Sequence, residues 1–204
     1  MKLFWSPRSP FVRKVMVFAH ETGLAGRIET ERTLVTMTQA NRELMRSNPL
    51  GKIPTLVTGD GRALFDSYVI CEYLDGLHGG AKLIPAAPEA RLQALRWHAV
   101  GDNLLDNLVA WLNELRRPAA QQSPETQAAF DVKVRSGLDF LEGEAATLGA
   151  TPVGIGHVTI AVALGYIDFR FPQLAWRDGR PKLAAWHKTF AQRPSFQATM
   201  PVDA

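Results

Sequence analysis

Two short stretches of this sequence place a hydroxyl at the predicted start of a helix. Ser9-Pro10 precedes one helical pattern, and Asp66-Ser67 opens another. Serine followed by proline is the order that a helix start prefers, because the hydroxyl accepts from the first free amides and proline has no N–H to satisfy. The same helix end favours negative charge, so a thiolate placed against Ser9 would be stabilised by its hydroxyl. Taken alone, Ser9 is more often a plain cap, and Ser6 is the alternative residue for a thiolate contact.

Asp66 and Ser67 bring a carboxylate, a hydroxyl and free amides to one point. Free amides at a helix N-terminus bind a carboxylate, and an aspartate pairs with an ammonium group. An amino acid could therefore bind with its carboxylate at the amides of Ser67 and its ammonium at Asp66. Taken alone, these two residues are also more often a helix cap.

A third stretch, residues 48–54, leads into the strand-like run TLVT. A proline that enters a strand must sit at its start or at an edge. The Ile53–Pro54 bond is a candidate for the cis form, which would leave the N–H and C=O of Ile53 facing outward to pair with an extended peptide. By itself this stretch predicts only a turn.

The elements that must position these groups fall into two parts. In the first 77 residues, short strand-like runs alternate with helical patterns, which is the organisation of an α/β unit. The helix at 11–23 is the clearest, because Phe11, Val15 and Phe18 lie on one stripe. We expect strands at 2–5, 28–35, 55–58 and 62–65, and helices at about 11–23, 38–46 and 67–77.

Beyond residue 77 we expect no strand. Residues 78–88, HGGAKLIPAAP, have the Gly and Pro content of a linker. The glycines at 154, 156 and 165 let neighbouring backbones approach closely, so we expect the third helix of this half to be the buried central one. The helical patterns lie at 89–117, 124–148, 154–171 and 181–193. The predicted organisation is an α/β domain at 1–77, a linker at 78–88 and an all-helical domain at 89–204.

The composition argues against several classes of protein. Lys and Arg number 23 against 20 Asp and Glu, a net charge of +3, and they are scattered without a nucleic-acid motif, so we expect no nucleic-acid partner. The single cysteine, Cys71, rules out an intramolecular disulfide, and the first residues lack the apolar run of a signal peptide. No apolar run is long enough to span a bilayer, so we expect a cytoplasmic protein without a membrane partner.

Histidine and tryptophan residues do not indicate a cofactor. The histidines show no metal-ligand spacing with acids or thiols, and we predict no metal site. The tryptophans are expected in the core, not as a cofactor platform. These are Trp97, Trp111, Trp176 and Trp186.

Together these segments resemble the glutathione transferase family. The resemblance is carried by SPFVRK at 9–14, NPLGKIPTLV at 48–57, FDSYVICEYL at 65–74, LGYIDFR at 164–170 and RPSF at 193–196. It implies a thioredoxin-like N-terminal domain, an all-α C-terminal domain and a homodimer. It also implies a glutathione site formed mainly by the first domain. The Ser-Pro-Phe arrangement is similar to serine-type members of the plant tau class and to bacterial members of unassigned substrate.

The resemblance also implies a role for each polar residue at the three stretches. Ser9 would hydrogen-bond the glutathione sulfur, and Lys52 would reach the glycyl carboxylate. Ile53, next to cis-Pro54, would pair with the cysteinyl backbone. Asp66 and Ser67 would hold the γ-glutamyl end.

These roles predict an enzyme that uses glutathione as a co-substrate and needs no other cofactor. We expect it to stabilise the glutathione thiolate and to direct it at a small hydrophobic electrophile or a hydroperoxide, a detoxification reaction. The alternative is a module that binds glutathione, an apolar ligand or a partner protein without significant turnover. Arg8 and Arg13 could line the site, but solvated surface or a salt bridge is the commoner place for such residues.

This sequence departs from the family pattern at two positions. The family usually begins its sixth helix with a Ser/Thr-x-x-Asp capping box, whereas this chain has Gly154-Ile155-Gly156-His157. A capping contact of about 1 kcal/mol is therefore expected to be weakened. Redox-active relatives have cysteine where this chain has Ser9, and Cys71 is expected to be buried and structural. Disulfide exchange through an enzyme thiol is therefore disfavoured.

Overall fold

Four short strands near the N-terminus form one mixed sheet in the order β2-β1-β3-β4. In the computed structural model, which describes residues 1–203, β1 is parallel to β2 and antiparallel to β3, and β3 is antiparallel to β4. The bounds are Lys2–Trp5 for β1, Glu29–Arg32 for β2, Thr55–Val57 for β3 and Ala63–Leu64 for β4. Each strand lies within a range predicted from the sequence.

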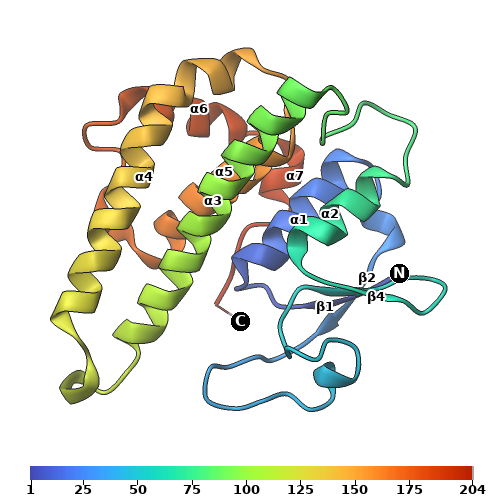
Figure 1. Ribbon diagram of the computed structural model, residues 1–204, viewed down its shortest axis with the longest axis horizontal. Coiled ribbons are helices and arrows are strands. Elements are labelled where there is room, and N and C mark those ends of the chain that lie inside the picture. The colour runs from blue at the N-terminus through green and yellow to red at the C-terminus, as the bar shows by residue number, and fades with distance from the viewer. Residues whose placement is uncertain (204) are drawn as a thin grey trace. The chain divides into compact units, whose positions relative to one another are not determined.

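Helices α1 (Pro10–Glu21) and α2 (Ser67–Asp75) pack side by side on one face of this sheet (Figure 1). Val15 and Phe18 of the α1 stripe and Ile70 and Leu74 of α2 are fully buried, as the three- and four-residue spacing predicts, whereas Phe11 is half-buried. The core of this unit includes Leu3, Val15, Phe18, Leu56, Ile70 and Leu74, each 0% exposed. A small mixed sheet covered in this way, with β1 followed by a helix and a parallel strand, confirms the predicted thioredoxin-like domain.

A second group of helices forms a unit of its own. It contains most of α3 (Pro88–Leu115), with α4 (Pro124–Ala150), α5 (Ile155–Arg170) and α6 (Pro181–Phe190). Helix α5 is buried from its first residue to Ile167, so it is the central helix of this unit, as predicted. Its glycine 156 allows the close approach: a Cβ there would lie 2.6 Å from the Trp97 Cβ of α3. The second unit is all-helical, as the sequence predicts.

The prediction of a helix at 38–46 is wrong. The segment is made of turns, with only a 3₁₀ turn at Leu44–Arg46. Polar side chains in this segment and just before it bind its backbone instead: Asn41 Oδ1 accepts from the Leu44 N–H at 3.0 Å, and Thr36 Oγ1 accepts from the Gln39 N–H at 3.1 Å. Such local bonds compete with a helix, and almost every side chain of the segment is exposed, so no apolar face favours one.

The compact units comprise residues 1–91 with the described residues from 194 onward, and residues 92–193. The C-terminal residues belong with the first unit because the short helix α7 (Pro194–Gln197) packs on α1. This helical turn was not predicted. The predicted domain bounds of 1–77 and 89–204 differ from these units at the C-terminus and stay a prediction.

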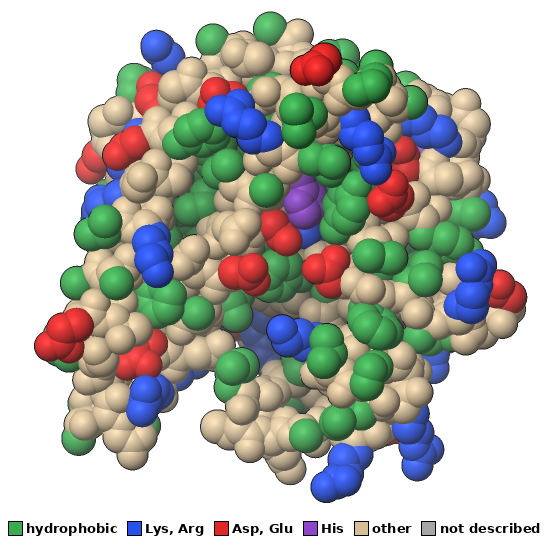
Figure 2. All heavy atoms as spheres, viewed as in Figure 1, with side chains coloured by type: hydrophobic (Ala, Val, Ile, Leu, Met, Phe, Trp, Pro, Cys, Tyr) green, Lys and Arg blue, Asp and Glu red, His purple; other side chains and the backbone are tan. Residues whose placement is uncertain are grey.

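Charged side chains of both signs are interspersed with apolar ones over the face that Figure 2 shows. This distribution agrees with the scattered basic residues of the sequence. Among the described residues 1–203, none of the helices combines the length and the apolar character that crossing a membrane requires.

Candidate functional site

The strand register brings the three predicted stretches to the same end of the sheet. Phe4 of β1 lies opposite Thr55 of β3, so the chain leaves β1 where it enters β3. Leu64 of β4 lies opposite Leu56, so the chain also leaves β4 at this end. Neighbouring strands are about 4.8 Å apart. The segments that meet there are residues 6–9, 52–54 and 65–67.

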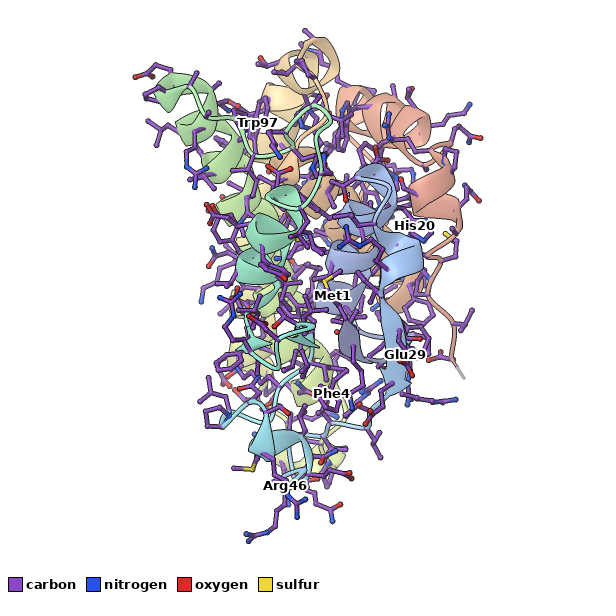
Figure 3. All side chains as sticks on the ribbon, turned by 90° about the vertical axis from the view of Figure 1, so that its right-hand side faces the viewer. Met1, Phe4, His20, Glu29, Arg46 and Trp97 are labelled. Atoms are coloured by element: carbon purple, nitrogen blue, oxygen red, sulfur yellow. The ribbon has the colours of Figure 1, made fainter. Side chains whose placement is uncertain are left out.

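Figure 3 agrees with this placement within the first unit. Phe4 and Arg46 lie toward one end of the unit, and His20, near the C-terminal end of α1, lies toward the other. The N-terminal end of α1 therefore lies at the same end of the sheet as the loop that follows Arg46.

Ser9 is the N-cap of α1. Its Oγ accepts from the Val12 N–H at 3.3 Å, and Pro10 occupies the first helical position, as predicted. Within residues 1–203 the Phe11 N–H has no hydrogen-bond partner. Ser6, the alternative, accepts from the Arg8 N–H at 3.4 Å and lies outside the helix. A half-buried hydroxyl and a free amide thus meet at the positive end of α1, which is a suitable place for an anion.

The turn before β3 presents backbone groups of Ile53 and the side chain of Lys52. The Ile53–Pro54 peptide bond is cis, which confirms the predicted form of this bond. In the part of the chain that the structure describes, neither the N–H nor the C=O of Ile53 has a hydrogen-bond partner. Lys52 is exposed and forms no ion pair within residues 1–203.

Asp66 and Ser67 form the N-terminal end of α2. The Asp66 Oδ1 accepts from the Tyr68 N–H at 2.9 Å, so the predicted cap is present. Ser67 is only 2% exposed, and within residues 1–203 its hydroxyl and N–H have no hydrogen-bond partner. The Val69 N–H is likewise free in this range. This end offers free donors to a carboxylate and one exposed carboxylate to a cation.

Tyr68, the next residue of α2, is held in a polar contact with Arg91, which lies in the first turns of α3. Its hydroxyl accepts from Arg91 Nη2 at 3.3 Å, and the same guanidinium pairs with Glu72 at 2.8 Å. Burial raises the pKa of the Tyr68 hydroxyl, with the Glu72 charge adding to this effect. The hydroxyl therefore stays protonated at neutral pH.

Arg8 and Arg13 have different surroundings. Arg8 is exposed, as expected for a solvated side chain. Arg13 is not at the surface: it is 6% exposed, its guanidinium lies 3.9 Å from the centre of the Phe196 ring, and Nη2 donates to the Phe196 carbonyl at 3.2 Å. Of the places expected for Arg13, the solvated surface is wrong, because the short helix α7, which was not predicted, packs on α1 and places Phe196 against the guanidinium.

Cysteine and tryptophan side chains have structural roles. Cys71 is 0% exposed within α2, as predicted for a structural thiol. Trp97, Trp111 and Trp176 are at most 8% exposed, which confirms their core role, and Trp186 is half-buried against Phe190. Within residues 1–203 no group of three His, Cys, Asp or Glu side chains is arranged to hold a metal ion.

The capping group of α5 is a histidine that sequence reasoning missed. His157 Nδ1 accepts from the Gly154 N–H at 3.1 Å, and its Nε2 lies 3.1 Å from the Leu148 carbonyl. The imidazole thus takes the place of the expected acid, although Gly154 supplies no side chain for the other half of the box. Burial lowers the pKa of His157, against the raising effect of the bond to the Leu148 carbonyl. The neutral ring with its proton on Nε2 satisfies both contacts.

Comparison with known proteins gives matches over both halves of the chain. Residues 8–77 match the family description "Glutathione S-transferase, N-terminal domain", and residues 124–189 match "Glutathione S-transferase, C-terminal domain". The GST-like protein YibF of Escherichia coli, itself uncharacterised, is 34% identical over 206 residues, 100% of each chain.

Solved structures of similar chains contain glutathione or a derivative. A glutathione transferase family member from Pseudomonas fluorescens Pf-5, with bound glutathione, is 40% identical, with a TM-score of 0.96 and 98% of each chain covered. A structure from the same species with bound S-(propanoic acid)-glutathione has a TM-score of 0.92 and 40% identity, covering 99% of this chain and 100% of the other. With both family domains matched and relatives similar over their whole length, this chain belongs to the glutathione transferase family.

Proposed function

We propose that this protein is a glutathione transferase that stabilises the glutathione thiolate at Ser9 and transfers it to a small hydrophobic electrophile. The observation that carries the proposal is the register of β1, β3 and β4, which places the Ser9, Ile53 and Ser67 segments at one end of the sheet. Relatives with 40% identity hold glutathione or an S-substituted glutathione, which supports the same ligand here.

Glutathione complements the groups that meet at this end of the sheet. It is an extended peptide with a carboxylate at each end and an ammonium group on its γ-glutamyl residue. In the proposed complex, Ser67 donates to the γ-glutamyl carboxylate and Asp66 pairs with the ammonium. Ile53 pairs with the cysteinyl main chain, and Lys52 reaches the glycyl carboxylate. The cysteinyl sulfur then lies against Ser9.

The chemistry follows from lowering the pKa of the bound thiol. A free thiol with a pKa near 8.5 is only a few per cent ionised at neutral pH, so a decrease of about two units makes it mostly thiolate. That decrease corresponds to roughly 3 kcal/mol. The Ser9 hydroxyl donates a hydrogen bond to the anion, and the end of α1 adds its field. Ser9 itself is not a nucleophile.

The thiolate then attacks the electrophilic carbon of the second substrate. A carbon–sulfur bond forms, and the leaving group departs with the electron pair of its bond. A hydroperoxide can be attacked by the same thiolate: the O–O bond breaks, the alcohol leaves, and the oxidised sulfur reacts with a second glutathione to give the disulfide and water. The buried Cys71 takes no part in either reaction.

Two measurements separate this enzyme from a module that only binds. Calorimetry with glutathione and with S-methylglutathione tests binding, and a panel of aryl halides, epoxides, unsaturated carbonyl compounds and hydroperoxides tests turnover. We expect binding of both ligands and glutathione-dependent turnover of at least one electrophile. Glutathione binding with no turnover across the panel would favour a glutathione-binding module. The absence of glutathione binding would contradict the enzyme and leave only a module for an apolar ligand or a partner protein.

A further inference from the structure

The loop that precedes β3 is held together by a buried asparagine. Asn48 is 1% exposed, and each polar atom of its side chain is used within this loop. Its Nδ2 donates to the Lys52 carbonyl and to Thr55 Oγ1, both at 3.0 Å. Its Oδ1 accepts from the Leu50 N–H at 3.0 Å. The asparagine therefore fixes the shape of the loop.

Thr55 completes the arrangement at the Lys52 carbonyl. Thr55 is 0% exposed, and its Oγ1 donates to the Lys52 oxygen at 2.8 Å. Together with Asn48 Nδ2, this gives the Lys52 oxygen two donors, one for each lone pair. The Lys52 carbonyl is thereby directed into the loop.

This contact also determines where the Ile53 N–H points. In a trans peptide unit the C=O of one residue and the N–H of the next point in opposite directions. The Lys52–Ile53 bond is trans, because the cis bonds near it are those before Pro54 and Asp66. With the Lys52 carbonyl directed inward, the Ile53 N–H points away from Asn48 and Thr55. It has no hydrogen-bond partner within residues 1–203.

We propose that Asn48 and Thr55 are positioning residues that hold the Lys52–Ile53 peptide plane so that the Ile53 N–H is directed at the main chain of the bound peptide. The inference rests on the proposed function, in which the ligand is glutathione and the Ile53 N–H donates to its cysteinyl carbonyl. A donor fixed before binding contributes more to affinity because the backbone need not be ordered on binding.

Thr55 is suited to a test because valine has the shape of threonine without its hydroxyl. Thr55→Val removes the donor to the Lys52 carbonyl, and Thr55→Ser retains it. Thr58 supplies a matched control at the other end of β3, since it is 5% exposed and all its hydroxyl bonds lie in the turn after β3. Its Oγ1 accepts from the Arg62 N–H at 3.1 Å, donates to the Asp60 carboxylate and lies 3.1 Å from the Arg62 carbonyl oxygen. Thr58→Val therefore removes a comparable buried hydroxyl from the turn after β3, away from Ile53.

The experiment measures the Kd of the full chain for glutathione and for S-methylglutathione, with thermal unfolding of each variant. We expect Thr55→Val to raise both Kd values by about fivefold or more, since one positioned hydrogen bond is lost. Thr55→Ser should restore most of the affinity, and Thr58→Val should lose stability but keep the wild-type Kd. The amide resonance of Ile53 should shift when glutathione binds to the wild-type protein and shift less in Thr55→Val.

The outcomes separate the two proposals. A wild-type protein that does not bind glutathione overturns the proposed function and this inference with it. If the wild type binds and Thr55→Val has the same Kd values, the positioning role is overturned and the proposed function stands. Equal losses of affinity in Thr55→Val and Thr58→Val would also overturn it, because affinity would then follow stability alone.

Discussion

Ser9 and Ser123 are two serine caps of the same form in one chain. Ser9 Oγ accepts from the Val12 N–H at 3.3 Å, and Ser123 Oγ accepts from the Thr126 N–H at 3.1 Å. Each is followed by proline at the first helical position. Ser9 lies at the end of the sheet where the Ile53 and Ser67 segments meet, whereas Ser123 belongs to the second unit, which contains no strand within residues 92–193. Comparing substitutions at the two serines therefore distinguishes the loss of a helix cap, which lowers stability, from the loss of a contact to the glutathione thiolate, which lowers turnover.

We predict that Ser9→Ala lowers both stability and turnover, whereas Ser123→Ala lowers stability alone. Each change removes a cap worth about 1 kcal/mol of unfolding free energy. Ser9→Ala should also cut kcat/KM at neutral pH by about tenfold or more, with partial recovery at higher pH as glutathione ionises unaided. Denaturant unfolding and pH profiles of kcat/KM check both effects. Wild-type kinetics in Ser9→Ala would assign the thiolate contact to Ser6 or to the backbone amides.

Ser9→Cys should gain disulfide-exchange activity toward a mixed disulfide of glutathione. The change introduces a thiol at the helix end, where the thiolate is stabilised and can attack the disulfide sulfur. An assay with a small mixed disulfide measures the gain. No exchange above the wild-type rate would show that this position does not face the glutathione sulfur.

His157 makes stability depend on pH. Burial places its folded-state pKa below the ordinary histidine value of 6.5, so the folded state binds fewer protons than the unfolded state. The contribution of His157 to the free energy of unfolding is complete at pH values above its pKa in the unfolded state. It is lost as the pH falls from that pKa toward the lower pKa of the folded state. Protonation of Nδ1 would also remove the acceptor for the Gly154 N–H.

We expect His157→Asn to flatten the pH dependence of unfolding below the ordinary histidine pKa of about 6.5, because asparagine can accept from Gly154 but does not titrate. His157→Ala should cost roughly 2 kcal/mol, for two buried hydrogen bonds of about 1 kcal/mol each. The exposed His20 supplies the control, His20→Asn. Denaturant unfolding across the pH range measures these effects, and an unchanged profile in His157→Asn would contradict the account.

At the scale of the elements, the backbones of α3 and α5 approach each other closely at Gly156 of α5. A Cβ on Gly156 would lie 2.6 Å from Trp97 Cβ and 2.8 Å from the Ala94 carbonyl oxygen. Because neither atom is the end of a flexible side chain, the helices themselves would have to move apart. By contrast, Gly143 of α4 is exposed, and a Cβ there would meet nothing within 4 Å.

We predict opposite effects for alanine at these two positions. Gly156→Ala should lower the free energy of unfolding by about 2 kcal/mol or more through overpacking. Gly143→Ala should raise it by roughly 0.5–1 kcal/mol, because alanine is the better helix former. Urea unfolding of both variants tests this, and a Gly156→Ala protein as stable as the wild type would show that α3 and α5 are less closely packed.

Most elements could be predicted because their sequence signals are local. Helices α1 and α4 have Ser-Pro starts, and α3 has a long apolar pattern. The segment at 38–46 has helix-forming residues too, but the side chains of Thr36 and Asn41 bind its backbone, and all of its side chains except those of Asn41 and Leu44 are exposed. The turn α7 depends on packing against α1, which no local pattern contains.

The sequence indicated most residues of the candidate site, but not all of the contacts that hold them. Residue types at helix and strand starts indicated Ser9, Ile53, Asp66 and Ser67, and the strand register then placed their segments together. Their individual roles stay predictions. The sequence predicted no role for Asn48, although an asparagine directly before proline is a turn signal, because its partners Lys52 and Thr55 become apparent only in the folded loop. The His157 cap was missed because the third helical position of a capping box usually carries an acidic side chain. Histidine can accept from the N-cap N–H there only when its ring is neutral.

At the scale of the whole molecule, we expect a homodimer, as the family resemblance implies. The first unit carries exposed apolar side chains such as Leu34, Met37 and Leu50, each at least 67% exposed, and association would be one way to cover such groups. Sedimentation equilibrium should give twice the mass of one chain at micromolar concentration. The mass of a single chain across the range would contradict this prediction and leave the glutathione site unaffected.

The central claim is that the protein lowers the pKa of the glutathione thiol, and its most direct test is a titration of that thiol in the complex. The ultraviolet absorbance of the thiolate is measured against pH with glutathione bound to the wild-type protein and to Ser9→Ala. We predict a bound pKa about two units below the free value near 8.5, and a return toward that value in Ser9→Ala. A wild-type complex whose thiol titrates at the free value would contradict the claim.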